Sequence, residues 1–249
     1  MGLLREETFL CLDLETTGLD PKNDQIIEVA LAIFTFDQIL TSFQSLVDPK
    51  CVIPEESIHI HGIDQTMVGG KPTIGSILPE VLALMDHYTI VGHGIDFDIT
   101  ALHAAAEREH IPLPNPKPKK IDTLRMARIY GESPINSLEK LREHFQIAFE
   151  GAHRAMNDVL VNIEVFKCLA KDYTTVKELE KILSKPIRMQ KMPLGKHKGR
   201  KFSEVPLEYL KWAVKKNFDN DLLFSIRSEL KLRRTRQSFE QSSNPFSDL

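Results

Sequence analysis

The stretch Thr8-Phe-Leu-Cys-Leu-Asp-Leu-Glu-Thr-Thr-Gly18 decides the fold of this chain. Its apolar part, residues 8–14, predicts a short β-strand that ends in charge. Because side chains alternate along a strand, Asp13 and Glu15 share one face. Two carboxylates on an apolar strand repel each other unless a cation lies between them, and such hard oxygen ligands favour Mg²⁺ or Mn²⁺. The strand end is therefore a candidate metal site. The hydroxyl groups and the flexible glycine backbone of residues 16–18 are suited to contact the terminal nucleotide of a strand.

The flanking sequence predicts further strands and helices around this strand. Residues 26–36 are long, β-branched and aromatic, and residues 40–47 follow a turn, so the chain opens as a meander of three strands. Two more short strands are expected at residues 90–93 and 120–124. Amphipathic helices are expected at residues 72–87, 98–110, 123–130, 137–145 and 154–171. Strands that come first and then alternate with helices predict a mixed α/β sheet covered by helices.

The formal net charge of −3 hides two parts of opposite sign. Residues 1–184 hold 17 Lys and Arg against 28 Asp and Glu, whereas residues 185–236 hold 15 against 5. This contrast indicates carboxylate chemistry in the first part and attraction to a polyanion in the second. The alternative is a gradual change of surface charge along the chain that has no functional role. The expected organisation is a main domain at 1–173, a linker helix at 174–190, a small basic module at 191–236 and a disordered tail at 237–249.

Cysteine use and hydropathy predict a soluble cytoplasmic protein without membrane association. Cys11, Cys51 and Cys168 are widely spaced and form no CxxC, which favours neither a disulfide framework nor a zinc site. Within its apolar run, Cys11 is expected to be a small buried hydrophobe. No apolar run approaches the roughly 20 residues that cross a bilayer.

Two later segments carry further candidate catalytic groups. Asp98 follows a predicted strand at the start of its helix, where a carboxylate can also simply satisfy free backbone amides. In His153-Arg-Ala-Met-Asn-Asp158 an imidazole precedes a carboxylate by five residues at a helix start, so both can face one point. A histidine with its usual pKa near 6.5 can accept a proton at neutral pH. Taken alone, His153 would be a surface or capping residue.

Three segments together resemble, in order and spacing, the motifs of the DEDDh exonuclease family. They are Asp13-Leu-Glu15-Thr-Thr-Gly, His93-x-x-x-Phe97-Asp98 and His153-Arg-Ala-Met-Asn-Asp158. This family includes the proofreading epsilon subunit of bacterial DNA polymerase III, exodeoxyribonuclease X and ribonuclease T, and the resemblance covers about residues 7–172. One departure is Gly94, where family members often carry Asn. The resemblance implies a ribonuclease H-like fold, with a mixed five-stranded sheet flanked by helices.

The resemblance also assigns roles to individual residues. Two Mg²⁺ or Mn²⁺ ions would be held by Asp13, Glu15, Asp98 and Asp158. His153 would take a proton from the attacking water, and a 5′-nucleoside monophosphate would leave from a 3′ end. The terminal nucleotide would be received by Thr16, Thr17, Gly18 and His61. For Asp122 a structural role is expected.

The basic module resembles the small C-terminal domain of exodeoxyribonuclease X-type nucleases. The similar segments are Pro193-Leu-Gly195-Lys-His-Lys-Gly199-Arg-Lys and Pro206-Leu-Glu-Tyr209-Leu-Lys-Trp212. Two glycines around Lys-His-Lys predict an exposed basic hairpin, and Trp212 is expected in the module's own core. Nucleic-acid contacts are expected from Lys196, Lys198, Arg200 and Lys201, unless these residues are only the solvated face of the module.

The sequence thus predicts a metal-dependent 3′–5′ exonuclease that acts on single-stranded or frayed 3′ ends of DNA in proofreading or repair. A DNA polymerase or another replication protein is a candidate partner. The alternatives are a ribonuclease T-like exoribonuclease, an endonuclease of ribonuclease H type, and a non-catalytic nucleic-acid-binding or polymerase-docking protein.

Overall fold

The computed structural model describes residues 3–115, 117–131, 135–148 and 154–242, with side chains described as far as residue 236. The chain divides into two compact units, Met1–Leu183 and Ser184–Leu249. Within the described ranges, no helix is both long and apolar enough to cross a membrane.

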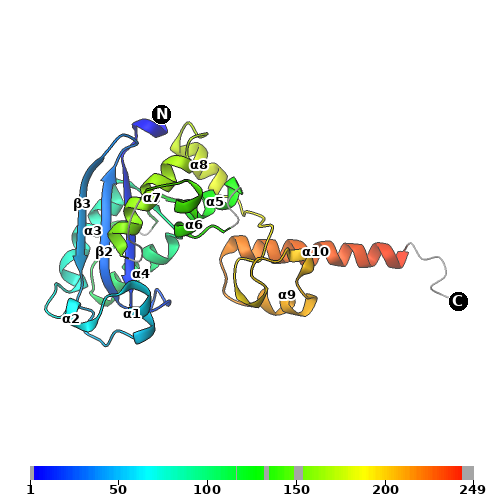
Figure 1. Ribbon diagram of the computed structural model, residues 1–249, viewed down its shortest axis with the longest axis horizontal. Coiled ribbons are helices and arrows are strands. Elements are labelled where there is room, and N and C mark those ends of the chain that lie inside the picture. The colour runs from blue at the N-terminus through cyan, green and yellow to red at the C-terminus, as the bar shows by residue number, and fades with distance from the viewer. Residues whose placement is uncertain (1–2, 116, 132–134, 149–153, 243–249) are drawn as a thin grey trace. The chain divides into compact units, whose positions relative to one another are not determined.

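A mixed sheet of five strands forms the centre of the first unit (Figure 1). The strands are β1 (Phe9–Thr16), β2 (Ile26–Phe34), β3 (Ile39–Leu46), β4 (Thr89–Gly92) and β5 (Lys120–Asp122). They lie in the order β3-β2-β1-β4-β5. The first three pair antiparallel, as the short turns between them require, while β1–β4 and β4–β5 are parallel and are connected through helices. The predicted mixed five-stranded sheet is confirmed.

Helices follow and separate the strands of this unit. Those of the first unit are α1 (Glu55–His61), α2 (Gln65–Val68), α3 (Ile74–His87), α4 (Asp96–Arg108), α5 (Thr123–Tyr130), α6 (Leu138–His144), α7 (Ala155–Leu169) and α8 (Val176–Leu183), with a short 3₁₀ turn at Leu4–Glu6. The sequence patterns predicted α3 to α7 to within a few residues, and α8 occupies only part of the predicted linker helix at 174–190, whereas α1 and α2 were not expected. Both are short, and an isolated helix of this length has little stability of its own.

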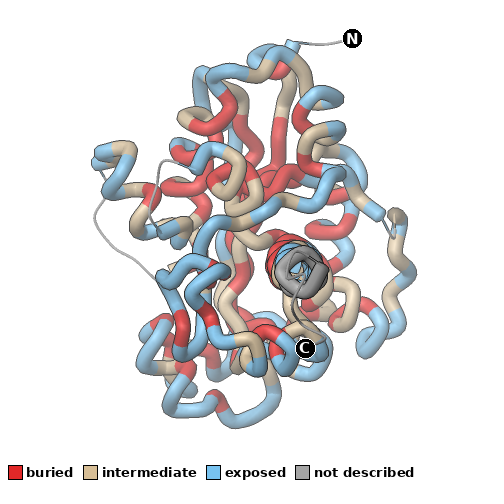
Figure 2. The backbone as a smooth tube through the Cα atoms, turned by 90° about the vertical axis from the view of Figure 1, so that its right-hand side faces the viewer, coloured by how far each residue is buried: buried red, intermediate tan, exposed pale blue. Residues whose placement is uncertain are grey.

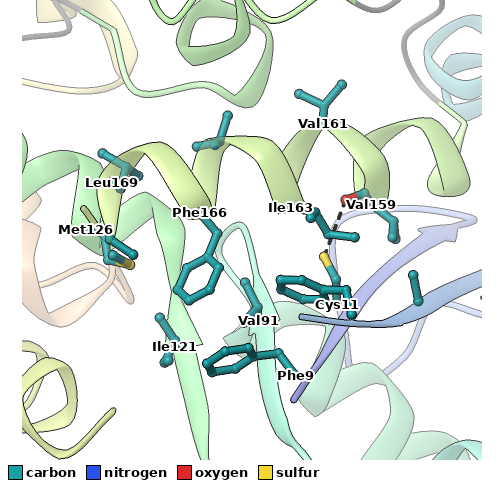
Figure 3. Packing of buried hydrophobic residues seen from close by; sticks show 14 of the residues in the cluster. Phe9, Cys11, Val91, Ile121, Met126, Val159, Val161, Ile163, Phe166 and Leu169 are labelled. Carbon is teal, nitrogen blue, oxygen red and sulfur yellow. Dashed lines mark hydrogen bonds between the residues drawn. The ribbon is translucent and has the colours of Figure 1, made fainter. Parts of the chain in front are cut away.

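Side chains that alternate along β1 build two cores on opposite faces of the sheet. Phe9 and Cys11 belong to the cluster that contains α7, while Leu10 and Leu12 belong to the cluster that contains α3 and α4. Figure 3 shows the first cluster, in which α7 lies across the strands and the ring of Phe166 packs 5.1 Å from that of Phe9, centroid to centroid. Buried residues gather along the strands, and exposed residues lie on the outer turns and helix faces (Figure 2).

Cys11 is fully buried, as expected for a small hydrophobe. Its Sγ lies 3.5 Å from the carbonyl oxygen of Val159 on α7, the contact drawn as a dashed line in Figure 3. Burial raises the pKa of this thiol, which excludes it as a thiolate nucleophile near neutral pH.

The second unit has a small core of its own. It contains α9 (Leu207–Ala213), α10 (Asn220–Ser242) and 3₁₀ turns at Gly195–His197 and Phe202–Glu204. Among the described residues, the buried apolar side chains of this core are Met192, Phe202, Val205, Leu210, Ala213, Leu222 and Ile226. The predicted exposed hairpin is confirmed in part: Lys191 and Lys201 form an antiparallel bridge, and Gly195 and Gly199 turn the chain with φ of +72° and +84°, but His197 between them is buried.

Three details of the second unit and its boundary differ from the sequence predictions. Residues 174–190 are not one linker helix, because Leu179 and Leu183 of α8 are buried in the core of the first unit. Helix α10 continues to Ser242, beyond the expected end of the module at residue 236. Trp212 is not a core residue, since 48% of it is exposed, beside Tyr209 and under the ammonium group of Lys216.

Candidate active site

Three carboxylates meet where β1 ends. Asp13 and Glu15 lie on the face of β1 that α7 covers, and Asp158 lies in the first turn of α7. One ligand oxygen from each of these residues lies within 4.8 Å of those of the other two. The structure thus brings together three of the four predicted metal ligands, from positions as far apart in the sequence as residues 13 and 158.

Asp98, the fourth predicted ligand, is not one of these three converging carboxylates; it comes from a helix on the opposite face of the sheet and raises the pKa of Asp13. It lies in the first turn of α4 and is buried, and its Oδ1 accepts a hydrogen bond of 3.2 Å from the amide of Leu14. Helix α4 begins just after β4, which runs parallel to β1, so its first turn lies beside the carboxyl end of β1. Ligands in sheets of this kind bind at the carboxyl ends of strands.

Burial and mutual repulsion raise the pKa values of these carboxylates. The pKa of Asp13 is well above its usual range, first because it is buried and then because of Asp98 and Asp158. Burial, followed by Asp158 and Glu28, raises the pKa of Glu15 to about 7. Burial raises that of Asp98 to about 8. A cluster that resists ionisation in this way is stabilised when a cation replaces the protons.

An ion pair with a buried carboxylate and a partly exposed arginine lies next to the cluster. Glu28 on β2 is directly opposite Glu15 on β1 and is completely buried. Its carboxylate accepts hydrogen bonds from Arg154 Nη2 (2.7 Å) and Nε (3.2 Å), from the amide of Ala155 (3.1 Å) and from Gln44 Nε2 (2.8 Å). Burial alone would raise the pKa of Glu28, but these hydrogen bonds outweigh it and the net shift is downward. Glu28 is therefore an anion that fixes the beginning of α7.

Sequence reasoning missed Glu28 and Arg154. A signal was present, because Glu28 is the only charged residue in a nine-residue strand whose other members are all apolar. A charge at such a position is rarely tolerated without a partner. The partner is 126 residues away, however, and no local pattern points to it.

A second network supports the loop before α4. Asp122 caps α5 by accepting from the amides of Leu124 (2.9 Å) and Arg125 (3.4 Å), and it also accepts from the amide of Gly94 (3.0 Å). This confirms the structural role expected for Asp122. Gly94 has φ of +76°, a conformation that glycine adopts freely and that asparagine tolerates better than most residues.

His93 of the second motif is part of this support. Its Nε2 donates to the carbonyl oxygen of Asn136 (2.9 Å), and its Nδ1 lies 3.1 Å from Thr123 Oγ1. Burial lowers the pKa of His93 to about 4, so the ring is neutral at physiological pH.

The predicted substrate-binding residues lie beside the end of β1, where their polar groups are mostly used within the fold. Thr16 donates to the carbonyl oxygen of Gly18 (2.7 Å), and Thr17 Oγ1 accepts from the amide of Gln25 (2.9 Å). Gly18 cannot carry a side chain unless the Asp24 carboxylate moves, because a Cβ on Gly18 would come within 2.4 Å of that carboxylate.

His61 at the end of α1 is buried. Its Nδ1 accepts a hydrogen bond of 3.0 Å from the amide of Ile63. Among the described residues its Nε2 has no hydrogen-bond partner.

The predicted general base, His153, lies outside the described residues, one position before Arg154. The four predicted nucleic-acid contacts, Lys196, Lys198, Arg200 and Lys201, are all exposed on the second unit.

Clustered carboxylates at the carboxyl end of the central strand, on a sheet of this order, define a ribonuclease H-like fold with an acidic centre able to hold divalent metal. Hard oxygen donors are the ligands that Mg²⁺ and Mn²⁺ prefer, and three such carboxylates converge here. The residues present therefore fit the cation that such a centre requires.

Comparison with known proteins identifies the family. Residues 10–166 match the sequence profile of the RNase T family, described as "Exonuclease". The chain is 32% identical over 189 residues to the DNA polymerase III subunit epsilon of Aquifex aeolicus, which covers 72% of this chain and 92% of that protein. This protein belongs to that exonuclease family, and the matched residues make up most of its first unit.

Other relatives are much longer than this chain. The PolC-type DNA polymerase III of Clostridium perfringens is 33% identical over 197 residues, which are 76% of this chain but only 13% of that protein. Among solved structures, the zinc-bound form of the Escherichia coli ExoI–ssDNA complex has the same fold, with a TM-score of 0.62 and 19% identity over 72% of this chain and 43% of that one.

The C-terminal unit has a different match from the one expected. Residues 179–226 match the profile of a family described as "Putative quorum-sensing-regulated virulence factor". An Exonuclease X structure in complex with 5′ overhanging duplex DNA has a TM-score of 0.56 and 22% identity, covering 70% of this chain and 98% of that one. The resemblance of residues 191–236 to an exodeoxyribonuclease X-type module thus stays a prediction.

Proposed function

We propose that this protein is a metal-dependent 3′–5′ exonuclease that releases 5′-nucleoside monophosphates from DNA ends. The observation that carries the proposal is the meeting of Asp13, Glu15 and Asp158 within 4.8 Å, beside Asp98. These four carboxylates would hold two Mg²⁺ or Mn²⁺ ions. When bound, the ions would stabilise the charge that develops on the scissile phosphate.

The residues of the chain would position the strand end and move one proton. Glu28 and Arg154 fix the start of α7, and Asp122 fixes the loop before Asp98, so that the carboxylates are held in place before substrate arrives. We propose His153 as the general base that removes a proton from the attacking water, on the strength of its place in the third motif. The backbone of residues 16–18 and His61 would contact the terminal nucleotide.

The test is a product analysis on matched DNA and RNA oligonucleotides labelled at the 5′ end. In Mg²⁺ the DNA should shorten one nucleotide at a time from its 3′ end, and Asp158→Asn should abolish release. Asp37→Asn is the matched control, because Asp37 is exposed in the β2–β3 turn at the other end of the sheet. Cleavage of a strand with a 3′-phosphate block would indicate an endonuclease, and preferential RNA trimming would indicate an exoribonuclease. Strand binding without cleavage would indicate a docking protein.

We also propose that the basic second unit contacts the nucleic acid, and that a DNA polymerase or another replication protein is a partner. The subunit epsilon relative supports the latter. Lys196→Gln with Lys198→Gln tests the hairpin contact. The double variant should bind single-stranded DNA more weakly than wild type and with a shallower dependence on salt.

A further inference from the structure

A pocket lies wholly within the second unit, between the base of its hairpin and α10. Its volume is about 550 Å³, within the range of small-ligand sites. Met189, Phe202 and Leu232 supply apolar surface, and Leu232 is 46% exposed. An apolar wall of this kind can accept the sugar or base of a nucleotide.

Hydrogen bonds fix all three segments that line the pocket. Arg233 of α10 donates to Glu229 (2.8 Å) and to the carbonyl oxygens of Phe202, Ser203 and Val205 (2.8, 2.9 and 2.9 Å). Ser225 of α10 accepts from the amide of Met189 (2.8 Å). The pocket therefore belongs to the folded unit and does not need a ligand to form.

The remaining charges in the pocket are positive. Lys191 and Lys201 face each other across the antiparallel bridge, and Arg188 and Arg236 line the same pocket. Residues opposite each other in such a bridge have Cβ atoms about 5 Å apart, and like charges there are destabilising. The lining carboxylate, Glu229, is already paired with Arg233. Two lysines held side by side in this way favour an anion between them.

We infer that this pocket binds the phosphodiester backbone of single-stranded nucleic acid. One phosphate lies between Lys191 and Lys201, and the adjoining nucleotide lies against Leu232. This inference rests on the proposed function for the identity of the polyanion. It adds a contact at the hairpin base to the one proposed for the hairpin tip. Of the four nucleic-acid contacts predicted from the sequence, Lys201 lines the pocket, whereas Lys196, Lys198 and Arg200 do not.

The test measures binding of a fluorescent 20-nucleotide single-stranded DNA to the full-length protein in EDTA, which prevents cleavage. Lys191→Gln with Lys201→Gln should weaken binding about tenfold and reduce the salt slope by about 0.7, since the one phosphate held between the two lysines contributes about 0.7 on a single strand. The charge-matched control is Lys211→Gln with Lys215→Gln, near the end of α9 and outside the pocket. It should change affinity less than threefold.

Two outcomes would overturn the inference. Equal losses in the pocket and control variants would mean that only the overall charge attracts DNA. Competition by polyglutamate as strong as that by DNA of equal charge would assign the pocket to an acidic peptide.

If the lysine variant does not fold, Arg188→Gln with Arg236→Gln tests the same pocket. A separate assay tests the proposed function without the pocket. The p-nitrophenyl ester of thymidine 5′-monophosphate is a single nucleotide, so its hydrolysis by the wild-type protein reports on the acidic site alone.

Discussion

Arg154 donates two hydrogen bonds to Glu28, at 2.7 and 3.2 Å, and so joins the start of α7 to the middle of the sheet. Glu28 is opposite Glu15, and two adjacent carboxylates would repel each other across β1 and β2 without this guanidinium. The pair therefore has two effects. It holds the helix that carries Asp158, and it limits the negative charge around Glu15.

Breaking this pair from the arginine side should destabilise the protein. Arg154→Met leaves Glu28 buried without its charged partner, and we expect a loss of about 2–3 kcal/mol, reduced from the value for a fully buried pair because Arg154 is partly exposed. Urea denaturation measures the loss. Glu28→Gln combined with Arg154→Met should cost less than Arg154→Met alone. Lys211→Met, which breaks an exposed pair with Glu208, should cost less than about 0.5 kcal/mol. A double variant less stable than Arg154→Met would contradict this reading.

The stability of the metal-free protein should fall as pH rises. Unfolded Asp and Glu lose their protons near pH 4, whereas in the folded protein the pKa of Glu15 is about 7 and that of Asp98 about 8. Between these values the folded state binds more protons than the unfolded state, so raising pH lowers the free energy of unfolding. Thermal denaturation from pH 7 to 8.5 in EDTA measures this decrease, because below that range buried His93, with its pKa lowered to about 4, contributes the opposite trend.

Divalent metal should reverse the same trend. Because metal ligation requires the deprotonated carboxylates, the rise in Tm caused by Mn²⁺ should grow with pH over the range from about 6.5 to 8.5. Asp158→Asn should reduce that rise, and Asp37→Asn should leave it unchanged. A metal-induced shift that is independent of pH would show that the cluster does not release protons on binding.

Removing Asp122 should cost more than removing another helix cap. Asp122→Ala frees three backbone amides, two in α5 and that of Gly94, so we expect a loss of about 2–3 kcal/mol. Asp64→Ala, which removes the more exposed cap of α2, should cost about 1 kcal/mol. Urea denaturation measures both losses. Equal losses would show that the hydrogen bond from the Gly94 amide to Asp122 adds nothing to the free energy of unfolding.

Alanine should have opposite effects at two glycines. A Cβ at Gly94 has room, with its nearest neighbour at 3.8 Å, but φ of +76° disfavours alanine, and Gly94→Ala should cost about 1 kcal/mol. Gly94→Asn should cost less. Gly69 has φ of −57° and ordinary contacts, so Gly69→Ala should stabilise by about 0.5 kcal/mol. Thermal denaturation distinguishes the signs, and a neutral Gly94→Ala would show that the loop relaxes.

The sequence predicted those parts of the fold that depend on local periodicity. The two-residue spacing of Asp13 and Glu15 fixed their common face, and the helical pattern after residue 154 placed Asp158 in a first turn. Helices α1 and α2 were missed because seven and four residues carry too little periodic signal, and they are stabilised by packing around Ile53, Ile63 and Val68.

Long-range electrostatics were harder to predict. The hydrogen bonds between Glu28 and Arg154 join residues that are 126 positions apart in the sequence. The antiparallel β-bridge between Lys191 and Lys201 depends on the register of the hairpin, and Gly195 and Gly199 indicated only where the hairpin turns. The prediction that Trp212 is a core residue was wrong, because a unit this small has too few core positions to enclose a large ring.

The acidic centre receives Asp158 from the helix layer on one side of the sheet and Asp98 from the layer on the other. A chain in which only one of these layers has docked holds an incomplete set of ligands. Partly folded forms, such as those emerging during synthesis, would therefore be chemically inert toward the cell's own DNA. Under the proposed function, the capacity to cut would require both helix layers to be docked on the sheet.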